Sequence, residues 1–154
     1  MTKKDFMKKT GVTKRTVNKW LEDKLIPNVQ DDETTGEPII PPSARRPYFA
    51  PSNLHGNQIA VSNSILTACL QGKYFTHDTF RISKSEFGMY IRQLKESGLI
   101  EETTEDGVTY YNSTVKSREL ATLSSRQRKQ TIANIIKAIA ETVEVVSNLS
   151  KMSA

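Results

Sequence analysis

Gly11 separates two short segments that each have the residue pattern of a helix, and this arrangement limits the folds that the chain can adopt. Residues 5–9 predict a short helix with Phe6 facing inward. Gly11 ends that helix, because glycine readily adopts the positive φ of a tight turn. Thr13 is then placed to cap a second helix through its hydroxyl. The pattern therefore predicts two helices joined by a turn of about three or four residues.

The second helix, predicted for residues 14–24, is amphipathic. Its apolar positions share one face and are Val17, Trp20, Leu21 and Leu25. Its other face is basic and also carries an amide: Lys14, Arg15, Asn18 and Lys19. Arginine pairs with guanine and asparagine with adenine, whereas lysine and threonine contact phosphates, so Thr13 and Lys8 join the candidate DNA-binding residues. We expect a helix-turn-helix; a helical hairpin that packs on another element, with its basic face in solvent, is the alternative.

Positive charge is concentrated in the same segment. Residues 1–25 contain eight Lys or Arg and three acidic residues, in a chain of 154 residues whose net charge is +5. Residues 126–137 contain four basic residues and no acidic one, whereas residues 30–37 and 101–106 are acidic runs. Positive potential attracts polyanions, most often nucleic acid. A lysine-rich terminus that is merely solvated is the alternative interpretation.

Residues 3–50 resemble the DNA-binding domains of the MerR and phage-excisionase superfamily. The matching stretches are Gly11 to Trp20, then Leu25-Ile26-Pro27, then Arg46-Pro47-Tyr48. The resemblance implies that the second helix enters the major groove and that a wing contacts the DNA backbone through Arg45, Arg46 and Tyr48. Residues 28–44 depart from the family pattern, because they are acidic, rich in proline and longer than a tight wing. DNA repels acidic groups, so we expect the tip of this insert to point away from DNA or to be mobile.

Residues 54–115 predict a second module, with two helices followed by a hairpin. The aromatic-rich residues 74–82 lie between the helices as a strand or a turn, and Ser83 begins a capping box for the second helix. A hairpin turn is expected at residues 105–107. This order resembles generic winged helices. Because the expected wing tip is acidic, a packing or partner-binding role is favoured over a second DNA contact, which stays open.

Residues 118–154 predict one long helix that starts near Ser124, since no Pro or Gly follows. Its apolar stripe consists of Ile132, Ile135, Ile136, Ile139, Val143, Val146 and Leu149. Such a stripe is unstable in water, so we expect it to form a homodimer that places two DNA-binding modules on a symmetric site. A lid helix packed on its own chain is one alternative. Binding to a membrane surface is another, which the absence of aromatic residues in the stripe disfavours.

The sequence thus predicts a mainly α fold with small β-hairpin wings, divided into domains at residues 1–50, 54–115 and 118–154. We expect a sequence-specific double-stranded DNA-binding protein that regulates transcription. An excisionase or other architectural factor, or a DNA-addressed adaptor of a mobile element such as a phage or plasmid, is the alternative.

An enzyme is not expected, because the chain lacks a His-Glu-x-x-His motif, a phosphate-binding loop and a Cys/His cluster. Cys69 is the only cysteine, and we expect no cofactor and no metal site. The lone histidines, His55 and His77, are expected at the surface or in hydrogen bonds. No run of apolar residues is long enough to span a bilayer and no signal peptide is recognisable, so we expect a cytoplasmic, nucleoid-associated protein.

Overall fold

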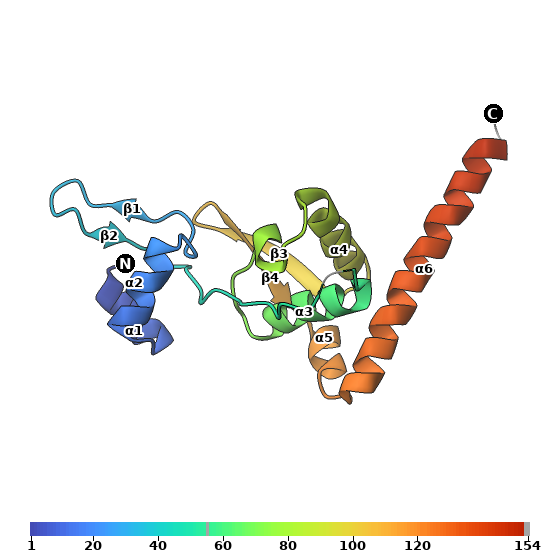
Figure 1. The fold of residues 1–154 in the computed structure, drawn as a ribbon, viewed down its shortest axis with the longest axis horizontal. Coiled ribbons are helices and arrows are strands. Elements are labelled where there is room, and N and C mark those ends of the chain that lie inside the picture. Colours follow the sequence, from blue (N-terminus) through green and yellow to red (C-terminus); the bar gives the residue numbers. More distant parts are fainter. Residues whose placement is uncertain (55, 153–154) are drawn as a thin grey trace.

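A computed structural model of the chain describes residues 1–54 and 56–152, with side chains up to residue 138. The fold is mainly α-helical with two small antiparallel hairpins, as expected (Figure 1). In chain order the elements are α1 (Lys3–Thr10), α2 (Lys14–Glu22), β1 (Gln30–Asp31), β2 (Pro38–Ile39), α3 (Gln58–Leu70), η1 (His77–Phe80), α4 (Lys84–Glu96), β3 (Ile100–Glu105), β4 (Val108–Ser113), α5 (Val115–Leu120) and α6 (Ser125–Met152). None of the helices described is long and apolar enough to cross a membrane.

Helices α1 and α2 and the segments on either side of the β1–β2 hairpin form a first hydrophobic core, here called the N-terminal core. Gly11 ends α1 in the left-handed region, at φ +73°, and Thr13 caps α2 by accepting a hydrogen bond from the amide of Thr16 at 3.3 Å. Both features were predicted, although α1 begins two residues before the predicted helix, because Thr2 caps it. The buried members of the N-terminal core are Phe6, Val17, Trp20, Ile26, Ile40 and Ala44.

A second cluster, here called the central core, lies among α3, η1, α4, the β3–β4 hairpin, α5 and the start of α6. The hairpin turns at Asp106 and Gly107, which both have positive φ, at 53° and 74°. These angles suit the two-residue turn of a tightly twisted hairpin, which was expected at this position. The aromatic-rich segment contributes an isolated bridge between Tyr74 and Pro47 and the short helix η1, rather than a full strand.

Helix α6 begins after Ser124, whose hydroxyl accepts a hydrogen bond from the Gln127 amide at 3.2 Å. Its first half packs on α3 and α4, and Ile132, 1% exposed, belongs to the central core. The expectation that Ile132 forms a dimer contact is therefore corrected, because its own chain covers it. Ile135 and Ile136 are half-buried against the same core.

The second half of α6 runs past the rest of the molecule in Figure 1. The remaining stripe positions, Ile139, Val143, Val146 and Leu149, lie outside the residues whose side chains are described. Packing on the same chain, the alternative to a dimer, thus applies to the first half of the helix. The dimer interface stays a prediction for the second half.

Candidate nucleic-acid interface

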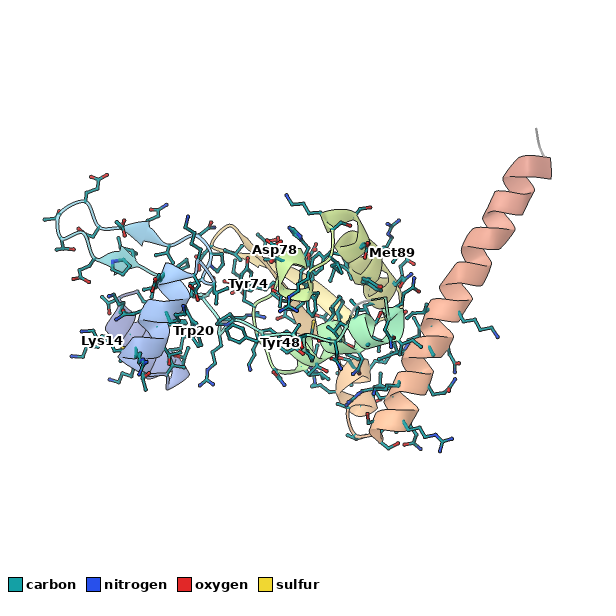
Figure 2. All side chains as sticks on the ribbon, viewed as in Figure 1. Lys14, Trp20, Tyr48, Tyr74, Asp78 and Met89 are labelled. Atoms are coloured by element: carbon teal, nitrogen blue, oxygen red, sulfur yellow. The ribbon has the colours of Figure 1, made fainter. Side chains whose placement is uncertain are left out.

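The outward side of α2 carries four of the nine predicted DNA-binding residues. Val17 and Trp20 are buried in the N-terminal core, so the opposite side of the helix faces solvent. The exposed predicted residues on that side, here called the α2 face, are Lys14, Arg15, Asn18 and Lys19. Figure 2 shows Lys14 at the end of the molecule that lies away from the central core. Glu22 is also exposed, at the C-terminal end of the same helix.

Two weak contacts engage the α2 face in the unbound chain. The ammonium of Lys3 donates a hydrogen bond to Oδ1 of Asn18 at 3.1 Å, and the ammonium of Lys19 lies 3.4 Å from the carboxylate of Asp23. Exposed ion pairs contribute little free energy, and both contacts can open when a stronger partner arrives. Lys3 was not predicted to belong to the site, because its place beside Asn18 depends on how α1 crosses α2.

Two further predicted residues are exposed outside the α2 face. Thr13 is exposed, and its hydroxyl forms a hydrogen bond of 3.0 Å with the hydroxyl of Thr16. Lys8 is exposed on α1. Its neighbour Lys9 has a structural role instead, because its ammonium donates to the carbonyl oxygens of Pro42 and Ala44 at 2.7 and 3.1 Å.

Two of the three residues expected in a DNA-binding wing form contacts within the chain, and their contact with DNA stays a prediction. The guanidinium of Arg46 donates a hydrogen bond to the carbonyl oxygen of Thr10 and thereby satisfies the C-terminal end of α1. The hydroxyl of Tyr48 lies 2.9 Å from that of Ser64, and its ring packs on Phe80 in the central core. Neither side chain belongs to the α2 face.

Arg45, the third expected wing residue, is placed between the two cores. Its guanidinium carbon lies 4.4 Å from the centroid of the Tyr110 ring, and its Nη1 atom is buried without a hydrogen-bond partner among the described residues. Tyr110 is 1% exposed and packs edge to face on Tyr74. A guanidinium held on an aromatic face in this way has an internal contact, and a contact of Arg45 with DNA stays a prediction.

The tip of the β3–β4 hairpin docks on the segment that follows α2. The carboxylate of Asp106 accepts a hydrogen bond from the amide of Ser43 at 3.0 Å, and its carbonyl oxygen accepts one from the side chain of Asn28 at 3.1 Å. A Cβ atom at Gly107 would lie 3.2 Å from that Asn28 side chain, so glycine suits both the turn and the contact. These contacts and the Arg45–Tyr110 pair are here called the joint.

The acidic residues at the tips of the two hairpins form different kinds of contact. Hydrogen bonds from the hydroxyl and amide of Ser43 lower the pKa of Asp106, so the acidic tip of β3–β4 serves the joint. The acidic tip of β1–β2 is exposed and stands out from the N-terminal core in Figure 1. There the amides of Thr34 and Thr35 donate to the Asp32 carboxylate and lower its pKa, which stabilises a local turn.

The histidine expectations are tested in part. His77 is half-buried, and its Nδ1 atom lies 3.0 Å from the carbonyl oxygen of Ile82, in a hydrogen bond as expected. His55 lies outside the described residues. Within the described part of the chain, no three His, Cys, Asp or Glu side chains are grouped as a metal ion would require.

No known protein family, curated protein or solved structure matches this chain. The resemblance of residues 3–50 to the MerR and excisionase proteins thus remains a prediction. The structure contributes two observations of its own, which are the exposed α2 face and the internal roles of Arg45, Arg46 and Tyr48.

Proposed function

We propose that the chain binds double-stranded DNA in a sequence-specific manner and regulates transcription. The carrying observation is the α2 face, where an arginine, an asparagine and two lysines are exposed on one short helix. Helices α1 and α2 would form a helix-turn-helix, with the N-terminal half of α2 in the major groove.

Two residues of the α2 face have the chemistry for contacts with bases. Arg15 can donate two hydrogen bonds to a guanine, and Asn18 can both donate to and accept from an adenine. Asn18 must release the Lys3 ammonium to do so, and Lys3, on the same surface, can then move to a phosphate. Lys14, Lys19 and Lys8 supply charge for further phosphate contacts.

The central core would support this function rather than provide a second base-contacting helix. Its order of helices and hairpin resembles that of a winged helix, but the hairpin tip is engaged in the joint through Asp106. Exposed Glu101, Glu102 and Glu105 on β3 would also repel phosphates. We assign this part of the chain to packing and to orientation of the N-terminal core.

Helix α6 would join two copies of the chain. Its second half extends past the central core, and the apolar stripe in the sequence continues there with spacings of three and four residues. A second copy of the same stripe is self-complementary, because a two-fold dimer pairs identical surfaces. Two α2 faces would then contact the two halves of an inverted repeat.

Selection from a pool of random duplexes, followed by sequencing, tests the proposal. We expect the full-length protein to enrich one sequence with two-fold symmetry. The selected duplex should then bind more tightly than a scrambled duplex of equal length, with log K falling steeply as log salt rises. No enrichment, or an affinity that does not change with salt, would contradict the proposal.

A further inference from the structure

The first turns of α6 form a second exposed basic surface, distant in sequence from the α2 face. Residues 125–138 contain four basic residues and no acidic one. Arg128 is tied to α3, because its Nε donates to Oδ1 of Asn63 at 3.0 Å. Arg126 and Lys129 are exposed. Within the described part of the chain, the side chains of these two residues form no ion pair and no hydrogen bond.

Arg126 and Lys129 line a groove of about 560 Å³ between the start of α6 and the start of α3. Asn57, Ser125 and Gln130 add polar groups, and no acidic or aromatic side chain is among its described lining residues. The helix that carries Arg126 and Lys129 is held in place at this point, because Ile132, about one turn after Lys129 on α6, is buried in the central core.

Among the residues whose side chains are described, none forms an ion pair with the cations of this groove. Neither α3 nor α6 has an acidic residue in its first turn, and cations at the N-terminal end of a helix oppose the helix dipole. An anion placed in the groove would remove both the mutual repulsion of the cations and their conflict with the dipole. A protein partner fits less well, because the groove offers no aromatic anchor of the kind that dominates protein interfaces.

We propose that Arg126 and Lys129 contact the phosphate backbone of the duplex bound by the α2 face, outside the base pairs that α2 contacts. This inference rests on the proposed function. It places the second contact outside the half-site that α2 contacts because α1 and α2 lie at one end of the molecule and α6 at the other (Figure 1). The groove therefore adds affinity and length to the footprint, and no base specificity.

Two duplexes and two variants test the inference. The short duplex contains a single half-site of the selected sequence, and the long duplex adds about ten base pairs, one helical turn, on each side of that half-site. The test variant is Arg126→Gln with Lys129→Gln. The control variant, Lys84→Gln with Arg92→Gln on α4, removes the same charge from exposed positions elsewhere. Circular dichroism and the unfolding temperature verify that both variants fold.

For the long duplex, we expect the test variant to bind several-fold more weakly than wild type. Its slope of log K against log salt should fall by about 1.8, which corresponds to about 0.9 for each of two lost phosphate contacts. Binding of the short duplex should not change, and the control variant should match wild type on both duplexes. Nuclease protection of the long duplex should extend beyond the half-site in wild type and retract in the test variant.

Equal binding of the long duplex by wild type and test variant would overturn the inference. If Arg15→Ala still removed sequence discrimination in that experiment, the proposed function would stand without the second contact. Equal weakening of both duplexes would also overturn the inference, because it would place the groove on the recognised sequence. Wild-type protein that binds neither duplex would remove both proposals together.

Discussion

The guanidinium carbon of Arg45 lies 4.4 Å from the ring centroid of Tyr110, and this contact links the segment after the N-terminal core to strand β4. Arg45 belongs to the segment that follows the N-terminal core, whereas Tyr110 is a buried residue of β4. The neighbouring Asp106–Ser43 hydrogen bond acts between the same two parts. The joint therefore fixes the orientation in which the α2 face is presented.

A double-mutant cycle with Arg45→Met and Tyr110→Leu measures the first contact. We expect a coupling free energy of about 0.5–2 kcal/mol in urea unfolding, because the cation lies over a buried aromatic ring. The single variant Arg45→Met should keep its DNA affinity per α2 face, since Arg45 is not on that face. Additive single effects, or a loss of DNA affinity in a folded Arg45→Met protein, would show that the side chain acts elsewhere.

The Asp106 contact predicts a stability difference that depends on pH. Hydrogen bonds from Ser43 lower the pKa of Asp106 below its ordinary value of 3.8. The ionised carboxylate therefore stabilises the folded state fully at pH values above 3.8. This stabilisation is lost as the pH falls through the lowered pKa. Asp106→Asn removes the charge but tolerates the positive φ of the turn. We expect the variant to have a lower urea midpoint than wild type at neutral pH, with the two midpoints converging in strong acid.

Glu105→Gln is the matched control for that measurement. Glu105 is the neighbouring exposed carboxylate on β3, and it has no ion pair within the described part of the chain. Its removal should leave the urea midpoint almost unchanged at neutral pH. A difference between wild type and Asp106→Asn that persisted unchanged in strong acid would exclude a role for the carboxylate charge.

Substitutions on the α2 face should separate base contacts from phosphate contacts. Arg15→Ala and Asn18→Ala should each reduce discrimination between selected and random duplexes by about 1–3 kcal/mol, if each makes a bidentate base contact. Lys8→Ala should weaken binding to all duplexes alike and lower the salt slope by about 0.9. Anisotropy titrations with both duplexes measure these effects. Equal losses on both duplexes for Arg15→Ala and Asn18→Ala would mean that another face contacts the bases.

Features encoded locally could be predicted from the sequence, and those that depend on distant partners could not. The turn at Gly11, the cap at Thr13 and the cap at Ser83 were predicted, because each needs only neighbouring residues. The α2 face follows from helical periodicity in the same way. Helix α5 was missed, since six residues are too few to establish a period.

The contacts of Arg45 and Tyr48 could not be predicted from the residues that surround them in the sequence. Tyr48 packs against the central core and Arg45 lies on Tyr110, which follows it by 65 positions in the chain. The sequence around Arg46-Pro47-Tyr48 resembles a DNA-binding wing, and the same polar and aromatic groups serve equally well as internal contacts. Only the tertiary arrangement distinguishes these uses.

The acidic tip of the β1–β2 hairpin should not contribute to DNA affinity. Replacement of Asp31, Glu33 and Glu37 by their amides removes three negative charges and leaves Asp32, whose carboxylate stabilises the turn. We expect affinity for any duplex to stay the same or to rise, with any gain disappearing at high salt because exposed charges are screened. Anisotropy at two salt concentrations measures this. A loss of affinity in the folded variant would instead identify the tip as a contact for DNA or for a partner.

Two substitutions in α6 distinguish its proposed dimer interface from its packing on its own chain. Ile132→Ala should lower the free energy of unfolding by about 2–5 kcal/mol, because Ile132 is 1% exposed in the central core, without breaking the dimer in the fraction that remains folded. Ile139→Asp places a charge in the stripe after the last residue whose side chain is described, where it should prevent pairing of two helices. We expect the Ile139→Asp protein to sediment as a folded monomer and to bind the full inverted repeat far more weakly than wild type, because the second half-site is no longer engaged at high effective concentration. Its affinity for an isolated half-site should be unchanged. Wild-type protein that sediments as a monomer at tens of micromolar would end the dimer proposal and leave α6 as a helix that stabilises its own chain.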